Sequence, residues 1–170
     1  TFVLNVTVSD SVFTSYLTIF VSLYRVDFST TTYFANVSEG APIGVVVAQL
    51  SLLNDNISLY TLSLSNHTHD FRVDSNGALL VNQMLDRELI AFYSFQAAAV
   101  YGQLYLVATI NITILDVNDN PPIFHPDVQN IVLLANTPVG LPISSLQFNV
   151  TDADEGSNAV YTFSLPSPDS

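Results

Sequence analysis

The chain has 170 residues, no cysteine, and three Lys plus Arg against fifteen Asp plus Glu, which gives a formal net charge of −12. A chain this acidic repels phosphate, which excludes a nucleic-acid-binding function and disfavours binding to an anionic membrane surface. The lack of cysteine excludes a disulfide scaffold, a thiolate metal site and a cysteine nucleophile, and a hydrophobic content of 49% argues against disorder.

Short apolar runs recur every 8–12 residues along the chain, and none shows the 3.6-residue period of an amphipathic helix. Turn-forming residues rich in Asn, Asp, Gly and Pro separate the runs. This spacing predicts an all-β chain of antiparallel sandwich type. In chain order, the expected strands cover residues 3–8, 16–24, 44–50, 59–64, 78–81, 92–98, 104–115, 131–134, 146–150 and 160–165.

Residues 89–115 form a run of 27 residues without a charge, which is long enough to span a bilayer. The second half of the run alternates isoleucine with the polar Asn111 and Thr113, and Gly102 interrupts the run like a turn. We therefore expect two strands here rather than a membrane span, and no insertion of this chain into a membrane. Because no signal peptide precedes the first expected strand, we interpret the chain as a fragment of a longer protein.

Six N-x-S/T sequons occur, each with a middle residue other than proline. Chance would produce a few of them, because Asn, Ser and Thr are plentiful. Together with the scarcity of lysine, the sequons favour an extracellular location. The candidate glycosylation sites are Asn5, Asn36, Asn56, Asn66, Asn111 and Asn149.

The chain contains an internal repeat. Residues 41–44 (APIG) match residues 137–140 (TPVG) 96 positions later, and residues 59–64 (LYTLSL) match residues 160–165 (VYTFSL). A period near 95–100 residues suits a tandem array of immunoglobulin-sized sandwiches. We therefore divide the chain into the C-terminal strands of one repeat (1–28), a complete repeat (29–121) and the N-terminal part of the next repeat (122–170).

Two segments concentrate carboxylates with no basic residue inside them. Residues 116–120 (DVNDN) combine two Asp with two Asn, and residues 152–154 (DAD) add two more Asp. Crowded carboxylates repel one another unless a cation intervenes. Oxygen ligands from Asp, Asn and backbone carbonyls suit Ca²⁺, which takes about six to eight of them. Residues 116–120 therefore predict a Ca²⁺ site, whereas residues 152–154 alone are better explained by a solvated turn.

Residues 115–124 (LDVNDNPPIF) resemble the inter-repeat linker of the cadherin superfamily. Residues 85–88 (LDRE) and 37–40 (VSEG) resemble two further family motifs, and residues 152–158 (DADEGSN) resemble the family's DADxGxN loop. The resemblance implies tandem Greek-key, immunoglobulin-like β-sandwiches in the ectodomain of an atypical cadherin. It also implies a plasma-membrane protein whose anchor lies outside this chain.

The resemblance further implies up to three Ca²⁺ ions at the linker 116–122. The expected ligands of the first ion are Glu39, Asp86, Glu88 and Asp119. Those of the second are Glu39, Glu88, Asp116, Asp119, Asp154 and the Val117 carbonyl. Those of the third are Asn118, Asp152, Asp154 and the carbonyls of Asn120 and Asn158. Three ions would nearly neutralise the seven carboxylates, so the linker would stiffen with metal and flex without it.

The upstream junction departs from the family pattern. When residues 21–24 are aligned with residues 112–115, Arg25 takes the position of Asp116 and Phe28 takes the position of Asp119. The complete repeat also lacks a DADxGxN loop, and residues 97–101 lack the family's late-loop Asp. We therefore expect few or no Ca²⁺ ions at residues 25–33. A linker of this kind could bend, or be held by apolar contacts from Phe28 and Tyr33.

Other sites are less well supported. The His67-x-His69 pair could bind a transition metal but is more typical of a polar loop, and Arg87 is interpreted as a charge-balancing neighbour of Glu88. We expect no enzymatic activity, because no G-x-S-x-G motif, Gly-rich phosphate loop or substrate cleft is evident.

The expected function is calcium-dependent cell adhesion or recognition, with other cadherin-like ectodomains as homophilic or heterophilic partners. Two alternatives remain open. The chain could be a spacer repeat that contacts no partner, which a uniformly polar surface would favour. It could also be a Ca²⁺-dependent carbohydrate-binding sandwich, which an open metal position beside a cleft would favour.

Overall fold

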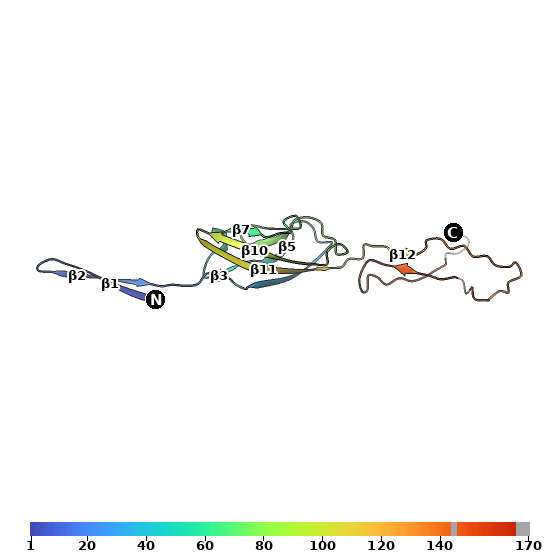
Figure 1. Ribbon diagram of the computed structural model, residues 1–170, viewed down its shortest axis with the longest axis horizontal. Helices are drawn as coiled ribbons and strands as arrows, with labels where there is room; N and C mark the ends of the chain where they lie inside the picture. Colours follow the sequence, from blue (N-terminus) through green and yellow to red (C-terminus); the bar gives the residue numbers. More distant parts are fainter. Residues whose placement is uncertain (144–145, 166–170) are drawn as a thin grey trace.

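The computed structural model describes residues 1–143 and 146–165, which form a hairpin, a central sandwich and an extended third part in a row (Figure 1). Residues 144–145 and 166–170, which the sequence assigns to the third repeat, lie outside the described residues. Within the described ranges the only helix is the 3-10 turn η1 (Ile57–Leu59). None of the described helices is long and apolar enough to cross a membrane.

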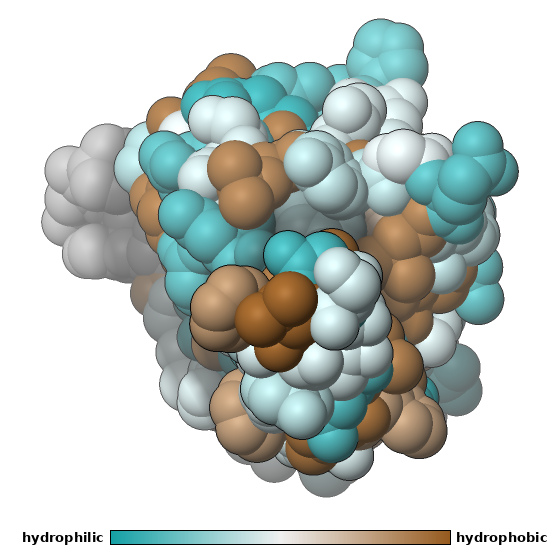
Figure 2. Space-filling model, turned by 90° about the vertical axis from the view of Figure 1, so that its left-hand side faces the viewer, coloured by the Kyte–Doolittle hydropathy of each residue, from teal (hydrophilic) through white to brown (hydrophobic). Residues whose placement is uncertain are grey.

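The hairpin consists of the antiparallel strands β1 (Phe2–Ser9) and β2 (Thr14–Val21). The Asp10 side chain closes its turn by accepting hydrogen bonds from the backbone N–H groups of Val12 and Phe13, at 2.8 and 2.7 Å. Strand β2 ends at Val21, three residues before the expected end. Seen from this end of the molecule, apolar and polar side chains are interspersed (Figure 2).

The central sandwich contains two main sheets. The four-stranded sheet has the order β4-β11-β10-β7, and the three-stranded sheet has the order β5-β9-β8. Strand β4 runs parallel to β11, and the other neighbours are antiparallel. The strands are β4 (Thr32–Ser38), β5 (Val46–Gln49), β7 (Thr61–Leu64), β8 (Phe71–Val73), β9 (Ala78–Val81), β10 (Phe92–Tyr101) and β11 (Leu104–Leu115).

The uncharged run 89–115 forms the β10–β11 hairpin, and Gly102 lies in its turn with a φ of +57°. Strand β11 shows the predicted two-residue period, since Ile110, Ile112 and Ile114 are each at most 3% exposed and the residues between them point outward. Such alternation places one face of the sheet on the core. The predicted all-β fold is therefore confirmed.

A short pair of strands, β3 (Asp27–Phe28) and β6 (Leu52–Leu53), completes the central sandwich. Phe28 is 3% exposed and packs edge-on against Tyr33, with ring centroids 6.3 Å apart. Val26 also packs against this core, so packing of the sandwich begins three residues before Ser29, the start of the complete repeat as divided from the sequence. Phe28 serves the core of its own sandwich instead of lying free in the linker.

The third part begins with β12 (Ile123–Phe124), which pairs with β13 (Val150–Thr151) as β3 pairs with β6. Gly44 and Gly140, the last residues of the two matching tetrapeptides, have φ values of +92° and +88°. The same turn therefore recurs in both copies of the sequence repeat.

Several strand predictions were wrong. Residues 131–134 and 160–165 form no strand, and of residues 146–150 only Val150 belongs to one. A strand needs a hydrogen-bonding neighbour, and the described residues offer none to these runs. Strands β4 and β8 were not predicted, because β4 places polar residues such as Asn36 on its exposed face and β8 has only three residues.

Candidate metal centre

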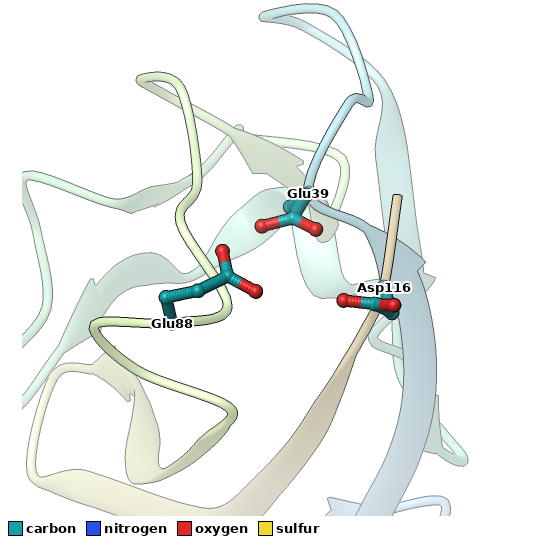
Figure 3. Close-up of side chains that lie close together, drawn as sticks. All are labelled: Glu39, Glu88 and Asp116. Carbon is teal, nitrogen blue, oxygen red and sulfur yellow. The ribbon is translucent and has the colours of Figure 1, made fainter. Parts of the chain in front are cut away.

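Three segments converge at the end of the central sandwich that faces the third part. The parallel register of β4 and β11 pairs Ser38 with Leu115, so Glu39 and Asp116 emerge side by side. The loop between β9 and β10 brings Glu88 to the same place. One carboxylate oxygen each from Glu39, Glu88 and Asp116 lies within 4.8 Å of the others, and the three side chains face one another (Figure 3).

Glu39 is a buried carboxylate, with 5% of its surface exposed. Its two oxygens accept hydrogen bonds from the backbone N–H groups of Val117 (2.8 Å) and Arg87 (2.7 Å), which fix the orientation of the side chain. No Arg or His side chain within the described residues forms an ion pair with it. Burial of an unpaired carboxylate is costly, so this position favours a cation.

Asp154 is the second buried carboxylate, with 6% exposure, and comes from the third part. It accepts hydrogen bonds from the backbone N–H of Asn120 (3.2 Å) and from the Asn120 side-chain amide (2.9 Å). The side chain of Asp152 accepts the backbone N–H of Asp154 at 3.1 Å and thereby shapes the loop. Asp154 likewise has no Arg or His ion-pair partner in the described part of the chain.

A cavity of about 390 Å³ opens beside Glu39. All four ligands expected for the first ion line it, together with Met84, Leu85 and Asn120. Asp86 is positioned there by accepting the backbone N–H of Leu89 at 2.9 Å, which closes a turn in the loop. The four acidic residues in the cavity wall are Glu39, Asp86, Glu88 and Asp119.

Asp116 connects the linker to the third part. One of its oxygens accepts hydrogen bonds from the backbone N–H of Glu155 and from the side-chain amide of Asn158, both at 2.9 Å. Burial would raise the pKa of Asp116, but these bonds and the nearby Arg87 guanidinium hold it below its usual value. The Asn118 amide also donates to the Asn158 carbonyl at 3.3 Å, so the two segments meet along the linker.

Arg87 has a larger role than the sequence interpretation assigned to it. Its guanidinium forms ion pairs with Asp116 and Glu88, and it also donates to the Ala153 carbonyl at 2.9 Å. A longer contact of 3.5 Å reaches Glu155. Burial would lower the pKa of Arg87, but Asp116 and Glu88 raise it, so the side chain stays charged. The sequence signal, a basic residue between two acids, could not show that Arg87 reaches the third part.

The remaining expected ligands lie along the same linker. The Val117 carbonyl accepts the backbone N–H of Asp119 at 2.9 Å, which makes a tight turn. The donor set of the whole centre consists of carboxylate, amide and carbonyl oxygens, which are the hard ligands that Ca²⁺ prefers. The residues present therefore fit Ca²⁺.

The His67-x-His69 pair forms no comparable group. The Nδ1 atom of His67 lies 3.2 Å from Asp70, and its ring packs against Tyr93 and Phe95. Among residues 1–143 and 146–165, the cluster around Glu39 is the only group of three His, Cys, Asp or Glu side chains with metal-ligand spacing. The contacts of His67 are those of a packed loop residue.

Comparison with known proteins identifies the relatives of this chain. It is 32% identical to human Protocadherin Fat 4 over 174 positions, which cover 98% of this chain and 3% of that protein. It is 34% identical to Protein dachsous of Drosophila melanogaster over 149 positions, which cover 81% of this chain and 4% of that protein. The chain thus spans only a small part of the relatives it matches. No protein-family model matches the chain.

Solved structures agree with these sequence matches. A structure described as the cis-dimer of Protocadherin gammaB7 repeats EC3–6 matches with a TM-score of 0.62 and 27% identity. The match covers 78% of this chain and 31% of that one. The central sandwich, the acidic linker that follows it and these similarities agree, and the chain belongs to the cadherin superfamily, as a stretch of its extracellular repeats.

Proposed function

We propose that the linker 116–122 is a calcium-binding hinge that stiffens the connection between two cadherin repeats of an adhesive ectodomain. The observation that carries the proposal is the burial of Glu39 and Asp154, one from each side of the linker, with no cationic side chain of residues 1–143 and 146–165 paired to either. The proposed ligands of up to three ions are Glu39, Asp86, Glu88, Asp116, Asp119, Asp152, Asp154, Asn118 and the carbonyls of Val117, Asn120 and Asn158.

The charge balance explains what the ions would supply. Seven carboxylates come from the proposed ligand set, and Arg87 contributes a single positive charge among them. Three Ca²⁺ ions would add six positive charges and remove most of the remaining repulsion. Because the ligands come from the central sandwich, the linker and the third part, shared ions would hold the three in one arrangement.

We propose that the upstream junction binds few or no ions. The connection from β2 to β3 comprises residues 22–26, whereas residues 116–122 connect β11 to β12. Asp27, the carboxylate that directly follows the shorter connection, is already paired with Arg25. The side-chain amide of Asn54 donates to the Arg25 carbonyl at 2.9 Å and holds the chain by a neutral hydrogen bond. The two junctions would therefore differ in their response to calcium.

The proposed setting is the extracellular side of a plasma-membrane protein whose anchor lies outside this chain. Other cadherin-like ectodomains are the proposed partners, in homophilic or heterophilic contacts, since one structural relative is described as a cis-dimer. Exposed Met84 (83%) and Leu89 (78%) near the calcium hinge offer apolar surface for such a contact. The proposed role is structural and adhesive rather than enzymatic.

The test compares wild-type chain with Asp119→Ala in calorimetric titrations with Ca²⁺ and in small-angle scattering. The wild type should bind two or three ions and reach a longer, narrower distribution of dimensions in Ca²⁺ than in chelator. Asp119→Ala should lose most of the binding and the change in shape. Asp127→Asn removes an exposed carboxylate outside the proposed ligands and is the control. Unchanged scattering of the wild type on calcium addition would contradict the stiffening role.

A further inference from the structure

The outer face of the four-stranded sheet carries a feature that the calcium hinge does not explain. In β4, Phe34 and Asn36 are exposed, whereas Val37 is buried in the core. Residues two apart on a strand point to the same face, so the Phe34 ring and the Asn36 amide are neighbours on the outer surface. Phe34 is 78% exposed, so most of its ring is accessible to a group attached beside it.

The six sequons differ in what their asparagine side chains do. Asn5, Asn56, Asn66 and Asn111 each accept a side-chain hydrogen bond, from Thr18, Ser58, Ser65 and Ser94 respectively. Asn111 is also half-buried in the central strand β11, between β4 and β10. Within the described residues, the side chains of Asn36 and Asn149 are the two that form no such bond.

Asn36 differs from Asn149 in its surroundings. Asn36 has an aromatic residue, Phe34, two positions before it, whereas Asn149 has Gln147 at that position. None of the other four sequons has an aromatic residue there. Strand β4 is also an edge of its sheet, with β11 as its single neighbour, so a bulky group on Asn36 has free space beside it.

We propose that Asn36 carries an N-linked glycan whose first sugar packs on the ring of Phe34. The apolar C–H face of a pyranose ring can cover an exposed aromatic face, as other apolar groups do. In the transfer, the Asn36 amide nitrogen bonds to the anomeric carbon of a lipid-pyrophosphate-linked oligosaccharide. The bond from that carbon to the pyrophosphate oxygen breaks, the lipid pyrophosphate leaves with the electron pair, and the amide nitrogen loses one proton.

The glycan would also shield an unpaired strand edge. The outer edge of β4 exposes backbone groups that could pair with another chain. A sugar fixed over Phe34 lies at this edge and blocks such pairing. The glycan would therefore confine contacts between copies of the chain to other surfaces. This proposal rests on the extracellular location within the proposed function, but not on calcium binding.

The test uses the chain secreted from mammalian cells, with occupancy of each sequon measured by mass spectrometry of its glycopeptides. We expect Asn36 to be occupied in most molecules. Phe34→Ala should lower the melting temperature of the glycosylated chain by about 2–8 °C, and by much less after enzymatic removal of the glycans. An unoccupied Asn36 in secreted chain would overturn the proposal.

A matched control is Phe92→Ala. Phe92 is 54% exposed on the same face of the sheet. It pairs with Thr113 of β11 from strand β10, and Asn36 pairs with the same Thr113 from strand β4. Its replacement should change the melting temperature equally with and without glycans. If Phe34→Ala behaved in the same way as this control, the stacking would be refuted. Calcium titration of the same samples tests the proposed calcium site independently, so a failure of the glycan proposal can be distinguished from a failure of calcium binding.

Discussion

Replacement of Glu39 by glutamine tests the calcium hinge most directly. The substitution keeps the shape of the side chain but removes the charge of a carboxylate that is 5% exposed and lies against Glu88 and Asp116. Glu39 is a proposed ligand of two of the three ions. At Ca²⁺ tenfold above the dissociation constant, each independent site adds about 1.4 kcal/mol to the free energy of unfolding, so three sites add about 4 kcal/mol. Glu39→Gln should lose about 3 kcal/mol of that increment.

Without calcium, the same substitution should have a smaller effect. The neutral amide cannot accept equally well from the backbone N–H groups of Arg87 and Val117, and a hydrogen bond to a charged group contributes about 1.5–3 kcal/mol. Removal of a buried negative charge beside two other carboxylates offsets part of this loss. The calcium-dependent difference is therefore the quantity to compare.

The assay is urea unfolding followed by far-ultraviolet circular dichroism, in chelator and in excess Ca²⁺. Glu155→Gln is the matched control, because Glu155 lies at the same junction but its side chain is 76% exposed and outside the proposed ligand set. The control should keep nearly the whole calcium increment. If Glu39→Gln kept it too, or if Glu155→Gln lost as much, calcium would act by general screening and the buried-ligand reasoning would be wrong.

Three further predictions concern Arg87, Gly77 and Tyr60. In chelator, Arg87→Ala should broaden the distance distribution between spin labels on the central sandwich and the third part, because the guanidinium contacts between them are lost; an unchanged distribution would show that Arg87 is no tether. Gly77→Ala should lower the free energy of unfolding in urea by at least about 2 kcal/mol, since φ is +83° and the new Cβ would lie 2.5 Å from the Leu50 carbonyl oxygen; near-wild-type stability would contradict the clash. Burial, followed by the hydrogen bond to Asp55, raises the pKa of Tyr60 to about 12. The folded state therefore holds the proton more tightly than the unfolded one, and this stabilisation is complete below the ordinary pKa of 10.0 and is lost as the pH rises through about 12. Ultraviolet titration of the folded chain should show this late ionisation step, and Tyr60→Phe should lack it.

Much of the central sandwich was predictable from residue patterns. The alternation along residues 104–115 identified the core face of β11, and Gly102 identified the turn before it. Both signals are local, since they depend only on the two-residue period of a strand and on the backbone freedom of glycine. The glycine turn recurs at Gly44 and Gly140, the corresponding positions of the internal repeat, so it too follows from a local signal.

Strand partners were less predictable. Strand β4 is held by parallel pairing with β11, about 77 residues later in the chain, and residues 131–134 stay outside any described strand although they are as apolar as β9. Whether a segment becomes a strand depends on a neighbour that offers hydrogen bonds, and local composition does not reveal that neighbour.

Residue patterns alone predict the all-β class, the internal repeat and the oxygen-rich character of the linker 116–122, because these follow from local periodicity and from Asp and Asn residues crowded in a short segment. The burial of Glu39 and Asp154 is visible only in the folded chain. The same holds for the contact of Arg87 with the third part and for the place of Phe28 in a core. Burial and pairing depend on which distant segments come into contact, and the register of the paired strands determines these contacts.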